Sequence, residues 1–197
     1  MSTSNKVQIL EGDVLTCSAD AIVQQINCVT TKSHGLSALI ASTFPYANIY
    51  AHRIPRKQRE SLRSSEKGNT ALHRSNPGDC IVCSDPEKKQ RDVICITGQL
   101  APGKPGYWCK AYHIDVKEDT AEKRQEYFKQ GLDKLVIYMT SSMVTPYLKI
   151  AFPWQIGCGL AGGTWIRYQS MIEQFAKNLY EHEKTRDTQI YIIKLIN

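Results

Sequence analysis

The segment LKIAFPWQIGCGLAGGTW, from Leu148 to Trp165, contains the features that decide the fold. Leu148–Phe152 is predicted to be a strand, because the apolar run is short and ends at Pro153, which has no N–H group for a further ladder bond. Four glycines follow within seven residues, and a helix is predicted to begin near Thr164. A strand, a glycine-rich loop and a helix in this order are typical of an α/β domain, in which such loops bind ligands.

Strands and helices alternate along the rest of the chain. Short apolar runs predict further strands at Val7–Leu10, Ala21–Ile26, Cys80–Cys83, Val93–Ile96 and Gln189–Ile196. Apolar residues at helical spacing predict helices along Leu36–Phe44, Phe128–Met139 and Trp165–Leu179. Asp119 is expected to cap the second of these helices, with Glu122 three positions on. The pattern predicts a single α/β domain over residues 1–197, with a mixed, largely parallel sheet.

The composition is that of a water-soluble globular protein. Of the 197 residues, 42% are hydrophobic and 22% are charged, which argues against a disordered or collagen-like chain. No apolar run reaches the roughly 18 residues of a membrane helix, so no membrane partner is expected. The first residues lack the features of a signal peptide, and the seven cysteines are odd in number. We therefore expect an intracellular protein, in the cytoplasm or nucleus, with reduced thiols.

Positive charge is concentrated in one stretch. The whole chain has 25 Lys and Arg against 19 Asp and Glu, a net charge of +6. Residues 51–75 alone hold seven basic and two acidic residues, a net charge of +5. This asymmetry predicts a polyanion contact through Arg53–Arg74, because Lys and Arg release counterions from phosphates. A solvated surface with no partner is the alternative interpretation.

Two loops are predicted at the same edge of the sheet. The loops Gln155–Gly163 and Thr30–Gly35 each join a strand to a helix, so both open at the carboxyl ends of strands. A glycine-rich backbone can turn several N–H groups toward one anion, and the N-terminus of the next helix adds a positive dipole. Two such loops predict a diphosphate ligand, and a glycine-rich turn without a ligand is the alternative. Neither loop has the Walker or the dinucleotide-binding fingerprint.

Four motifs follow one another along the chain. They are the Gly-Asp turn Glu11–Val14, the strand Ala19–Asn27 with its terminal Asn, the loop Ser33–Ala38, and the loop and helix start Pro153–Trp165. Their order and context resemble the macro domains, a family that binds ADP-ribose. The resemblance implies a three-layer α/β/α fold around a mixed, largely parallel sheet. It also implies ADP-ribose or an ADP-ribosylated macromolecule as the partner, with no cofactor.

The resemblance also assigns a role to each motif. Asp13, flanked by Gly12 and Val14, is expected to accept a hydrogen bond from the adenine amino group. Asn27 is expected to bind hydroxyl groups of the distal ribose. Backbone N–H groups are expected to bind the two phosphates, from Gly35, Leu36 and Ser37 in the first loop and from Gly157, Cys158, Gly159, Leu160, Ala161 and Gly162 in the second. The alternatives are an ordinary turn residue for Asp13 and a local backbone hydrogen bond for Asn27.

One branch of the family bears on catalysis. The stretch Asn27–Pro45 is similar to the branch of terminal ADP-ribose glycohydrolases and the yeast-type ADP-ribose-1″-phosphate phosphatase. In the glycohydrolases a Lys and an Asp carry the chemistry, and the corresponding positions here are Gly98 and Ala161. We therefore expect weak or absent hydrolysis, by water that the catalytic candidates Asn27 and His34 position.

Three classes of function stay open from the sequence. The first is a protein that binds ADP-ribose, free or attached to protein or nucleic acid, with weak de-ADP-ribosylation at most. The second is an enzyme that removes ADP-ribose or hydrolyses ADP-ribose-1″-phosphate. The third is a basic module that binds nucleic acid or poly(ADP-ribose).

Two cysteine spacings are similar to those of zinc sites, Cys80-x-x-Cys83 and Cys109-x-x-x-His113. Residues three apart on a strand point to opposite faces, so Cys80 and Cys83 are not expected to share one ion. We therefore expect free thiols and no metal.

Overall fold

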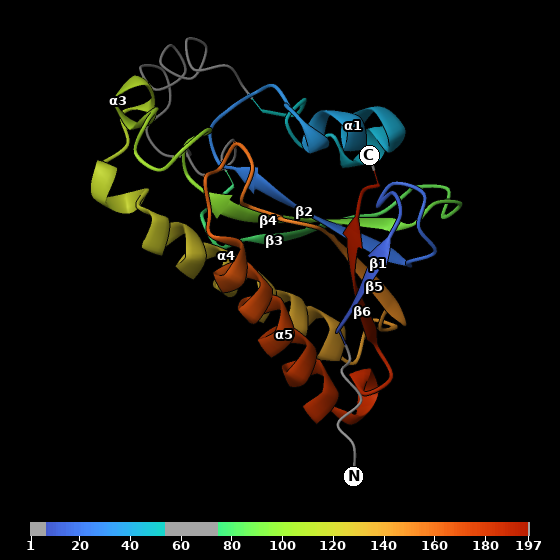
Figure 1. Ribbon diagram of the computed structural model, residues 1–197. Helices are drawn as coiled ribbons and strands as arrows, with labels where there is room; N and C mark the ends of the chain where they lie inside the picture. Colours follow the sequence, from blue (N-terminus) through green and yellow to red (C-terminus); the bar gives the residue numbers. More distant parts are fainter. Residues whose placement is uncertain (1–6, 54–74, 197) are drawn as a thin grey trace.

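A six-stranded sheet forms the centre of the computed structural model, which describes residues 7–53 and 75–196 (Figure 1). The strands lie in the order β1-β6-β5-β2-β4-β3. Their bounds are β1 Val7–Glu11, β2 Ala21–Asn27, β3 Cys80–Cys83, β4 Asp92–Gln99, β5 Lys149–Pro153 and β6 Gln189–Lys194. β3 runs antiparallel to β4, and the other four pairings are parallel. The mixed, largely parallel sheet expected from the sequence is confirmed.

The central strands are apolar because both of their faces are covered. On β2, Ile22 and Val23 are 0% exposed although they point to opposite faces of the sheet. Ile22 pairs with Ala151 of β5, and Val23 pairs with Ile94 of β4. Near-continuous apolar runs of this kind are typical of parallel strands that have helices on both sides.

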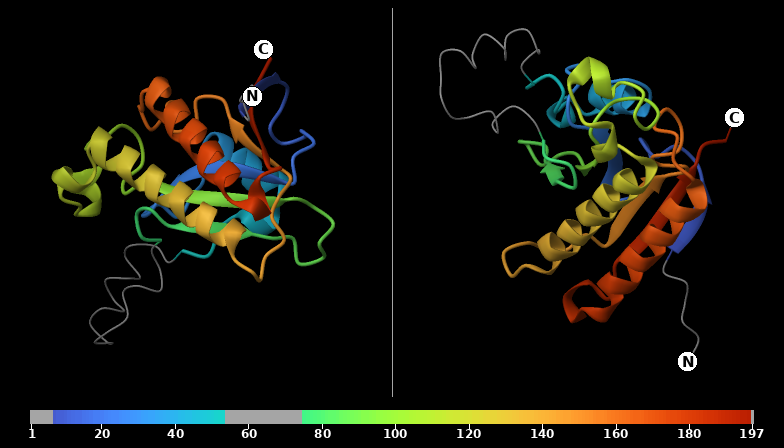
Figure 2. Two further views of the ribbon diagram at one scale, coloured as in Figure 1. Left: turned by 90° about the horizontal axis from the view of Figure 1, so that it is seen from below. Right: turned by 90° about the vertical axis from the view of Figure 1, so that its left-hand side faces the viewer.

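Three longer helices form the two outer layers (Figure 2). α4 (Ala121–Thr140) and α5 (Trp165–Glu181) pack on one face of the sheet, and α1 (Leu36–Thr43) packs on the other. The connecting segments contain α3 (Cys109–Tyr112) and short 3-10 helices at Pro45–Ala47, Val116–Glu118 and Glu183–Thr185. The expected α/β/α layering is therefore confirmed.

The start of α4 differs from the expectation. Its N-cap is Thr120, whose side chain accepts a hydrogen bond from the backbone N–H of Lys123. Asp119, the expected cap, is 0% exposed and forms an ion pair with Arg124 instead. The capping prediction for Asp119 was wrong because the buried carboxylate is already satisfied by internal donors.

The cysteines are free thiols, and none of the seven forms a disulfide. Within residues 7–53 and 75–196, no group of three or more His, Cys, Asp and Glu side chains could hold a metal ion. No helix in this described part is long and apolar enough to span a lipid bilayer.

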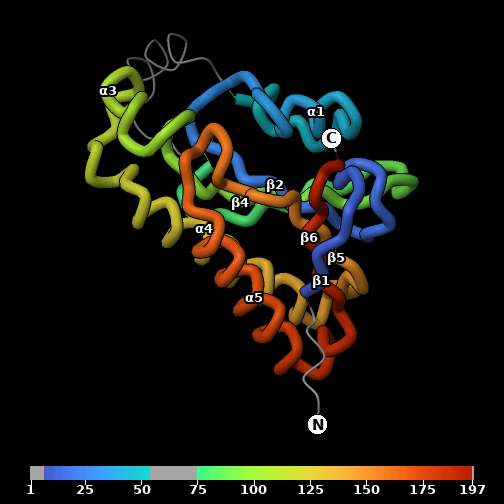
Figure 3. The backbone as a smooth tube through the Cα atoms, viewed as in Figure 1, coloured from blue at the N-terminus to red at the C-terminus, as the bar shows by residue number. Residues whose placement is uncertain are grey.

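One edge of the sheet carries the connections that matter for function. β2, β4 and β5 are parallel, so their carboxyl ends lie at the same edge. The loops that follow these three strands come together there, between α1 and the start of α5 (Figure 3). This is the place where open α/β sheets bind ligands.

Candidate ligand-binding site

A cavity of about 660 Å³ opens at this edge of the sheet. Most of its walls come from the first loop with the start of α1, from residues 99–112 and from residues 153–161, while the end of β2 and Tyr50 also line it. Of the residues predicted from the sequence, nine line the cavity: Asn27, His34, Gly35, Leu36, Ser37, Gly157, Gly159, Leu160 and Ala161. The structure therefore brings the two predicted loops and both catalytic candidates to one cavity.

The side chain of Asn27 organises the first loop. Its Oδ1 accepts hydrogen bonds from the backbone N–H groups of Val29 (3.0 Å) and Thr30 (2.8 Å) and from the Thr30 hydroxyl (3.0 Å). Its Nδ2 has no acceptor in the part of the chain that the structure describes, and Asn27 lines the cavity. The alternative of a local hydrogen bond thus applies to the amide oxygen, while the amide nitrogen is available to a ligand.

The first loop ends where α1 begins. Gly35 has φ +55°, a left-handed conformation that favours glycine, and its carbonyl accepts from the N–H of Ala38. Leu36 and Ser37 are the first residues of the helix, where N–H groups lack an intrahelical acceptor. A Cβ at Gly35 would lie 3.7 Å from Leu160 Cδ1 of the second loop. The two predicted loops therefore approach each other across the cavity.

The second loop closes on itself through backbone bonds, and some of its N–H groups, that of Gly157 among them, have no acceptor in the described residues. The N–H of Gly162 donates to the carbonyl of Gly159 at 3.0 Å, and two further backbone bonds involve the N–H groups of Cys158 and Gly163. Among the described residues, no acceptor is bonded to the N–H groups of Gly159, Leu160 and Ala161, which line the cavity. Cys158 and Gly162 do not line it, and their N–H groups are bonded within the loop.

The Gly-Asp turn lies outside the cavity. Asp13 Oδ1 accepts a hydrogen bond from the backbone N–H of Leu15 at 2.9 Å, so the carboxylate stabilises its own turn. The N–H of Gly12 donates to the carbonyl of Lys194 at the end of β6. Gly12, Asp13 and Val14 therefore sit at the same sheet edge but do not line the cavity.

Aromatic residues that the sequence interpretation did not single out form part of the walls. Trp108 and Tyr112, from the segment after β4, line one side. Trp154 lines the other, with its ring 4.8 Å from that of Trp165 and 5.7 Å from Lys194 Nζ. Trp154 directly follows a predicted buried strand, and this position could have identified it from the sequence as a residue of the site. The loop that carries Trp108 has no such pattern.

Gln25 fills the floor beside Gly98. A Cβ at Gly98 would lie 2.7 Å from Gln25 Cδ, a distance that real side chains do not tolerate. Gln25 Nε2 donates to Gln99 Oε1 at 3.0 Å, which holds the side chain in this position. Its neighbour Gln24, 2% exposed, donates through Nε2 to Cys95 Sγ. A side chain at position 98 would thus have to displace Gln25.

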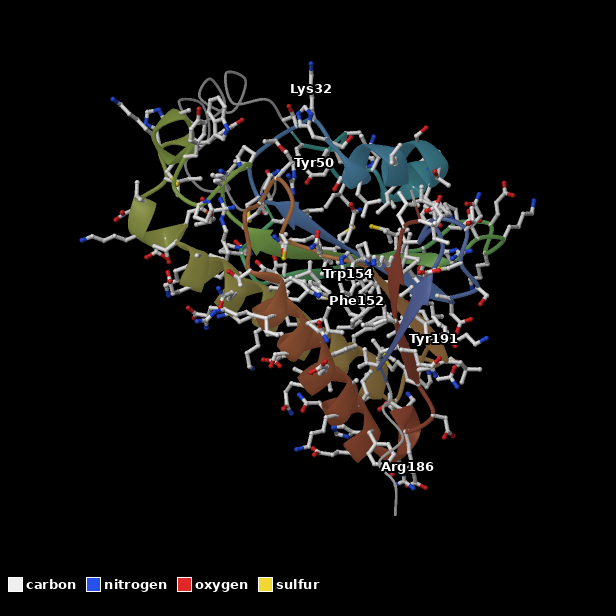
Figure 4. The ribbon with its side chains drawn as sticks, in the orientation of Figure 1. Lys32, Tyr50, Phe152, Trp154, Arg186 and Tyr191 are labelled. Atoms are coloured by element: carbon white, nitrogen blue, oxygen red, sulfur yellow. The ribbon has the colours of Figure 1, made fainter. Side chains whose placement is uncertain are left out.

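The cavity has no acidic side chain among the residues that the structure describes. Its ionisable side chains are Lys32, His34, Tyr50 and Tyr112. Lys32 extends outward at the rim, with Tyr50 below it in the view of Figure 4. Burial raises the pKa of Tyr50, so this hydroxyl is neutral near pH 7. An anion can therefore enter without repulsion from a carboxylate.

Arg53 supports the first loop from behind. It is 8% exposed, its Nη1 donates to the carbonyl of Thr30 at 2.9 Å, and its Nη2 donates to Ser75 Oγ at 3.1 Å. Its guanidinium carbon lies 4.7 Å from the centre of the Tyr50 ring. The sequence led us to expect Arg53 in a polyanion surface, whereas in the structure its guanidinium is buried and occupied by these internal contacts. The rest of the predicted basic surface, residues 54–74, lies outside the described residues.

Comparison with known proteins gives similar folds at low sequence identity. No family model and no curated protein matches the chain. The Trypanosoma brucei macrodomain in complex with ADP is 12% identical, with 97% of this chain and 64% of that chain covered, at a TM-score of 0.59. The same macrodomain in complex with ADP-ribose is 13% identical, with 100% and 68% covered, at a TM-score of 0.57. The macrodomain of Mycobacterium tuberculosis DarG is 14% identical, with 96% and 99% covered, also at 0.57. The chain therefore has the macrodomain fold.

Proposed function

We propose that the chain binds ADP-ribose, free or attached to a protein or nucleic acid, and that it removes ADP-ribose from such carriers weakly or not at all. The observation that carries the proposal is the set of unused N–H groups at Gly159, Leu160 and Ala161, which line the cavity together with the N-terminus of α1. Such groups bind the oxygens of a diphosphate. The Trypanosoma brucei macrodomain, which shares the fold, was solved with ADP and with ADP-ribose.

The strand order gives the ligand a direction. From one side of the sheet to the other, β1 ends near Asp13, β5 ends next to Trp154, β2 ends at Asn27 and β4 ends at Gln99. We place the adenine near Asp13 and Trp154, because an acceptor and an aromatic face suit a purine. The diphosphate then lies between the two loops, and the distal ribose lies at Asn27 Nδ2 and Gln99.

Ligand fragments test this binding mode. ADP-ribose and ADP contain the diphosphate, whereas adenosine does not. We expect thermal stabilisation in the order ADP-ribose, ADP, adenosine at equal concentration, because stabilisation grows with the ratio of ligand concentration to Kd. Adenosine that stabilises the protein as much as ADP-ribose would remove the diphosphate from the account.

Catalysis is expected to be slow because no described side chain on the cavity forms a nucleophile and base pair. Gln25 occupies the space beside Gly98, and no carboxylate from residues 7–53 or 75–196 lines the cavity. Asn27 Nδ2 and His34 can hold a water molecule near the distal ribose, which supports slow hydrolysis without a covalent intermediate.

A single-turnover assay tests this. ADP-ribosylated protein, ADP-ribosylated DNA and ADP-ribose-1″-phosphate are the three substrates, so that removal of ADP-ribose and phosphatase activity are separated. We expect slow release at most, lost in Asn27→Ala and in His34→Ala. Rapid turnover that survives both changes, or a lysine adduct trapped by borohydride, would show that other groups carry the chemistry.

A further inference from the structure

A buried ion pair lies behind the cavity, where α4 begins. Asp119 is 0% exposed and Arg124 is 2% exposed. Arg124 Nε donates to Asp119 Oδ1 at 3.0 Å and Arg124 Nη2 donates to Asp119 Oδ2 at 2.6 Å. The pair is therefore bidentate, the strongest arrangement of these two groups.

The guanidinium is also bonded to backbone carbonyls of two loops. Nη1 donates to the carbonyl of Gly103 at 2.6 Å and to that of Ala161 at 3.0 Å. Nη2 donates to the carbonyls of Ala101 at 3.1 Å and Lys104 at 3.3 Å. All nitrogens of the group are thus used, which is what a buried Arg requires.

Asp119 contacts one of the same loops from the other side. Its Oδ1 accepts from the N–H groups of Leu100 (3.1 Å) and Ala101 (3.4 Å), and its Oδ2 accepts from the N–H of Gly106 (3.4 Å). The pair therefore determines the path of residues 100–106, which supply Gly103 to the cavity wall.

Stability alone does not account for such a pair. Replacing a buried ion pair with apolar side chains of similar volume is often neutral or stabilising, because two charges no longer lose their hydration. What the pair contributes here is geometry. Gly103 and Ala161 line the cavity from different loops, and one nitrogen, Arg124 Nη1, binds the carbonyls of both.

We propose that Arg124, held by Asp119, is a positioning residue for anion binding. It fixes the carbonyl of Ala161, within the turn that the bond from Gly162 to Gly159 closes. The N–H groups of this turn are thereby held at a constant distance from the wall formed by residues 100–106. This inference rests on the proposed function, since the anion is the diphosphate of ADP-ribose.

The variant Arg124→Lys tests the proposal. Lysine keeps the charge opposite Asp119 but carries all its donors on one nitrogen in place of the three nitrogens of the planar guanidinium. It therefore cannot reproduce the bidentate bond to Asp119 together with the bonds to the carbonyls of Gly103 and Ala161. We expect the Kd for ADP-ribose to rise about tenfold or more, because a small displacement of binding groups is costly. Backbone amides of Gly162 and Gly163 should exchange faster with deuterium.

A matched control separates positioning from general stability. Phe175→Leu makes a cavity in the core beneath α5, at a residue that does not line the binding site, and should lower the melting temperature. At a temperature where both variants are folded, Phe175→Leu should keep the wild-type Kd. An equal Kd for Arg124→Lys, Phe175→Leu and wild type would overturn the proposal.

Two further measurements cover a variant that does not fold. The double change Asp119→Leu with Arg124→Met replaces the pair by apolar side chains, and the folded product should bind ADP-ribose at least about tenfold more weakly. In the ligand-free wild type, the backbone amides of Gly162 and Gly163 should be protected from hydrogen–deuterium exchange. Exchange of these amides at the rate of an open loop would also overturn the proposal. Wild-type protein that is protected there but does not bind ADP-ribose would instead refute the proposed function.

Discussion

The side chain of Gln25 occupies the space into which a side chain at Gly98 would project. A Cβ built on Gly98 would lie 2.7 Å from both Cδ and Oε1 of Gln25, and Gln25 is held there by its bond to Gln99. The two residues are on neighbouring strands, and Gln25 lines the cavity. The floor is thus filled by an amide that neither attacks a sugar nor donates a proton at neutral pH.

The first prediction concerns this packing. Gly98→Ala should destabilise the protein by about 1–3 kcal/mol, because the added methyl group overpacks the floor. In a Gln25→Ala background the same change should cost much less. Urea unfolding of the two single variants and the double variant measures the coupling. Additive effects would mean that the two side chains do not compete for this space.

A second prediction concerns Asp13. Asp13→Ala should weaken ADP-ribose binding by about 1–3 kcal/mol, because the adenine amino group would lose a buried acceptor. Asp13→Asn is the control, since its amide oxygen can still accept from the N–H of Leu15 and from adenine. Calorimetry on the three proteins checks this. Equal affinity for Asp13→Ala and wild type would leave Asp13 as a turn residue only.

The third prediction is a pH dependence at Cys158. Burial raises the pKa of this thiol from its ordinary value of 9.0 to about 11. The thiolate is the reactive form, so alkylation of Cys158 should be slow at pH 8 and rise until about pH 11. Peptide-mapped iodoacetamide labelling measures this, and a plateau at or below pH 9 would contradict it.

The same shift predicts the direction of a stability change. Between about pH 9 and pH 11 the Cys158 thiol loses its proton in the unfolded chain but keeps it in the folded chain. The free energy of unfolding therefore falls as the pH rises through this range. Below pH 9 both states are protonated and this thiol adds no slope. The variant Cys158→Ser should show a smaller loss of stability over this range.

A fourth prediction concerns the basic stretch. If residues 54–74 contact phosphates, affinity for poly(ADP-ribose) or single-stranded RNA should fall steeply with salt, and charge reversal at Arg56, Lys57 and Arg59 should flatten the slope. Binding of free ADP-ribose should change little. Polymer binding that is absent or insensitive to salt would leave a solvated surface as the explanation.

The fold was predictable because its signals are local. The apolar run before Pro153, the glycines after it and the helical spacing from Trp165 each depend on a few neighbouring residues, and the structure has β5, a loop and α5 there. The ends of elements were less predictable. The predicted closing strand continued to Ile196, whereas β6 ends at Lys194, because nothing in the side-chain pattern marks where pairing stops.

The parts of the site that could not be predicted depend on distant contacts. The ion pair of Asp119 and Arg124 looks in the sequence like an ordinary cap and an exposed helix residue, and only the folded loops supply the carbonyls that bury it. Trp108 lies in a loop without periodicity, so its place on the cavity wall follows from tertiary structure alone. The N–H groups of Cys158 and Gly162 are bonded within the loop, which the sequence does not show, because it does not reveal which N–H groups a loop uses itself.

The most direct test of the central claim is calorimetry of ADP-ribose binding to the wild type and to Gly159→Glu. A Cβ at Gly159 meets no atom within 4 Å, so the variant should fold, yet its carboxylate would stand where the diphosphate must lie. Gln174→Glu, which adds the same charge on the exposed side of α5, is the control. Wild type and Gln174→Glu should each bind one ADP-ribose per chain, and Gly159→Glu should bind none. No heat from the wild type at millimolar ADP-ribose, or equal binding by Gly159→Glu, would contradict it.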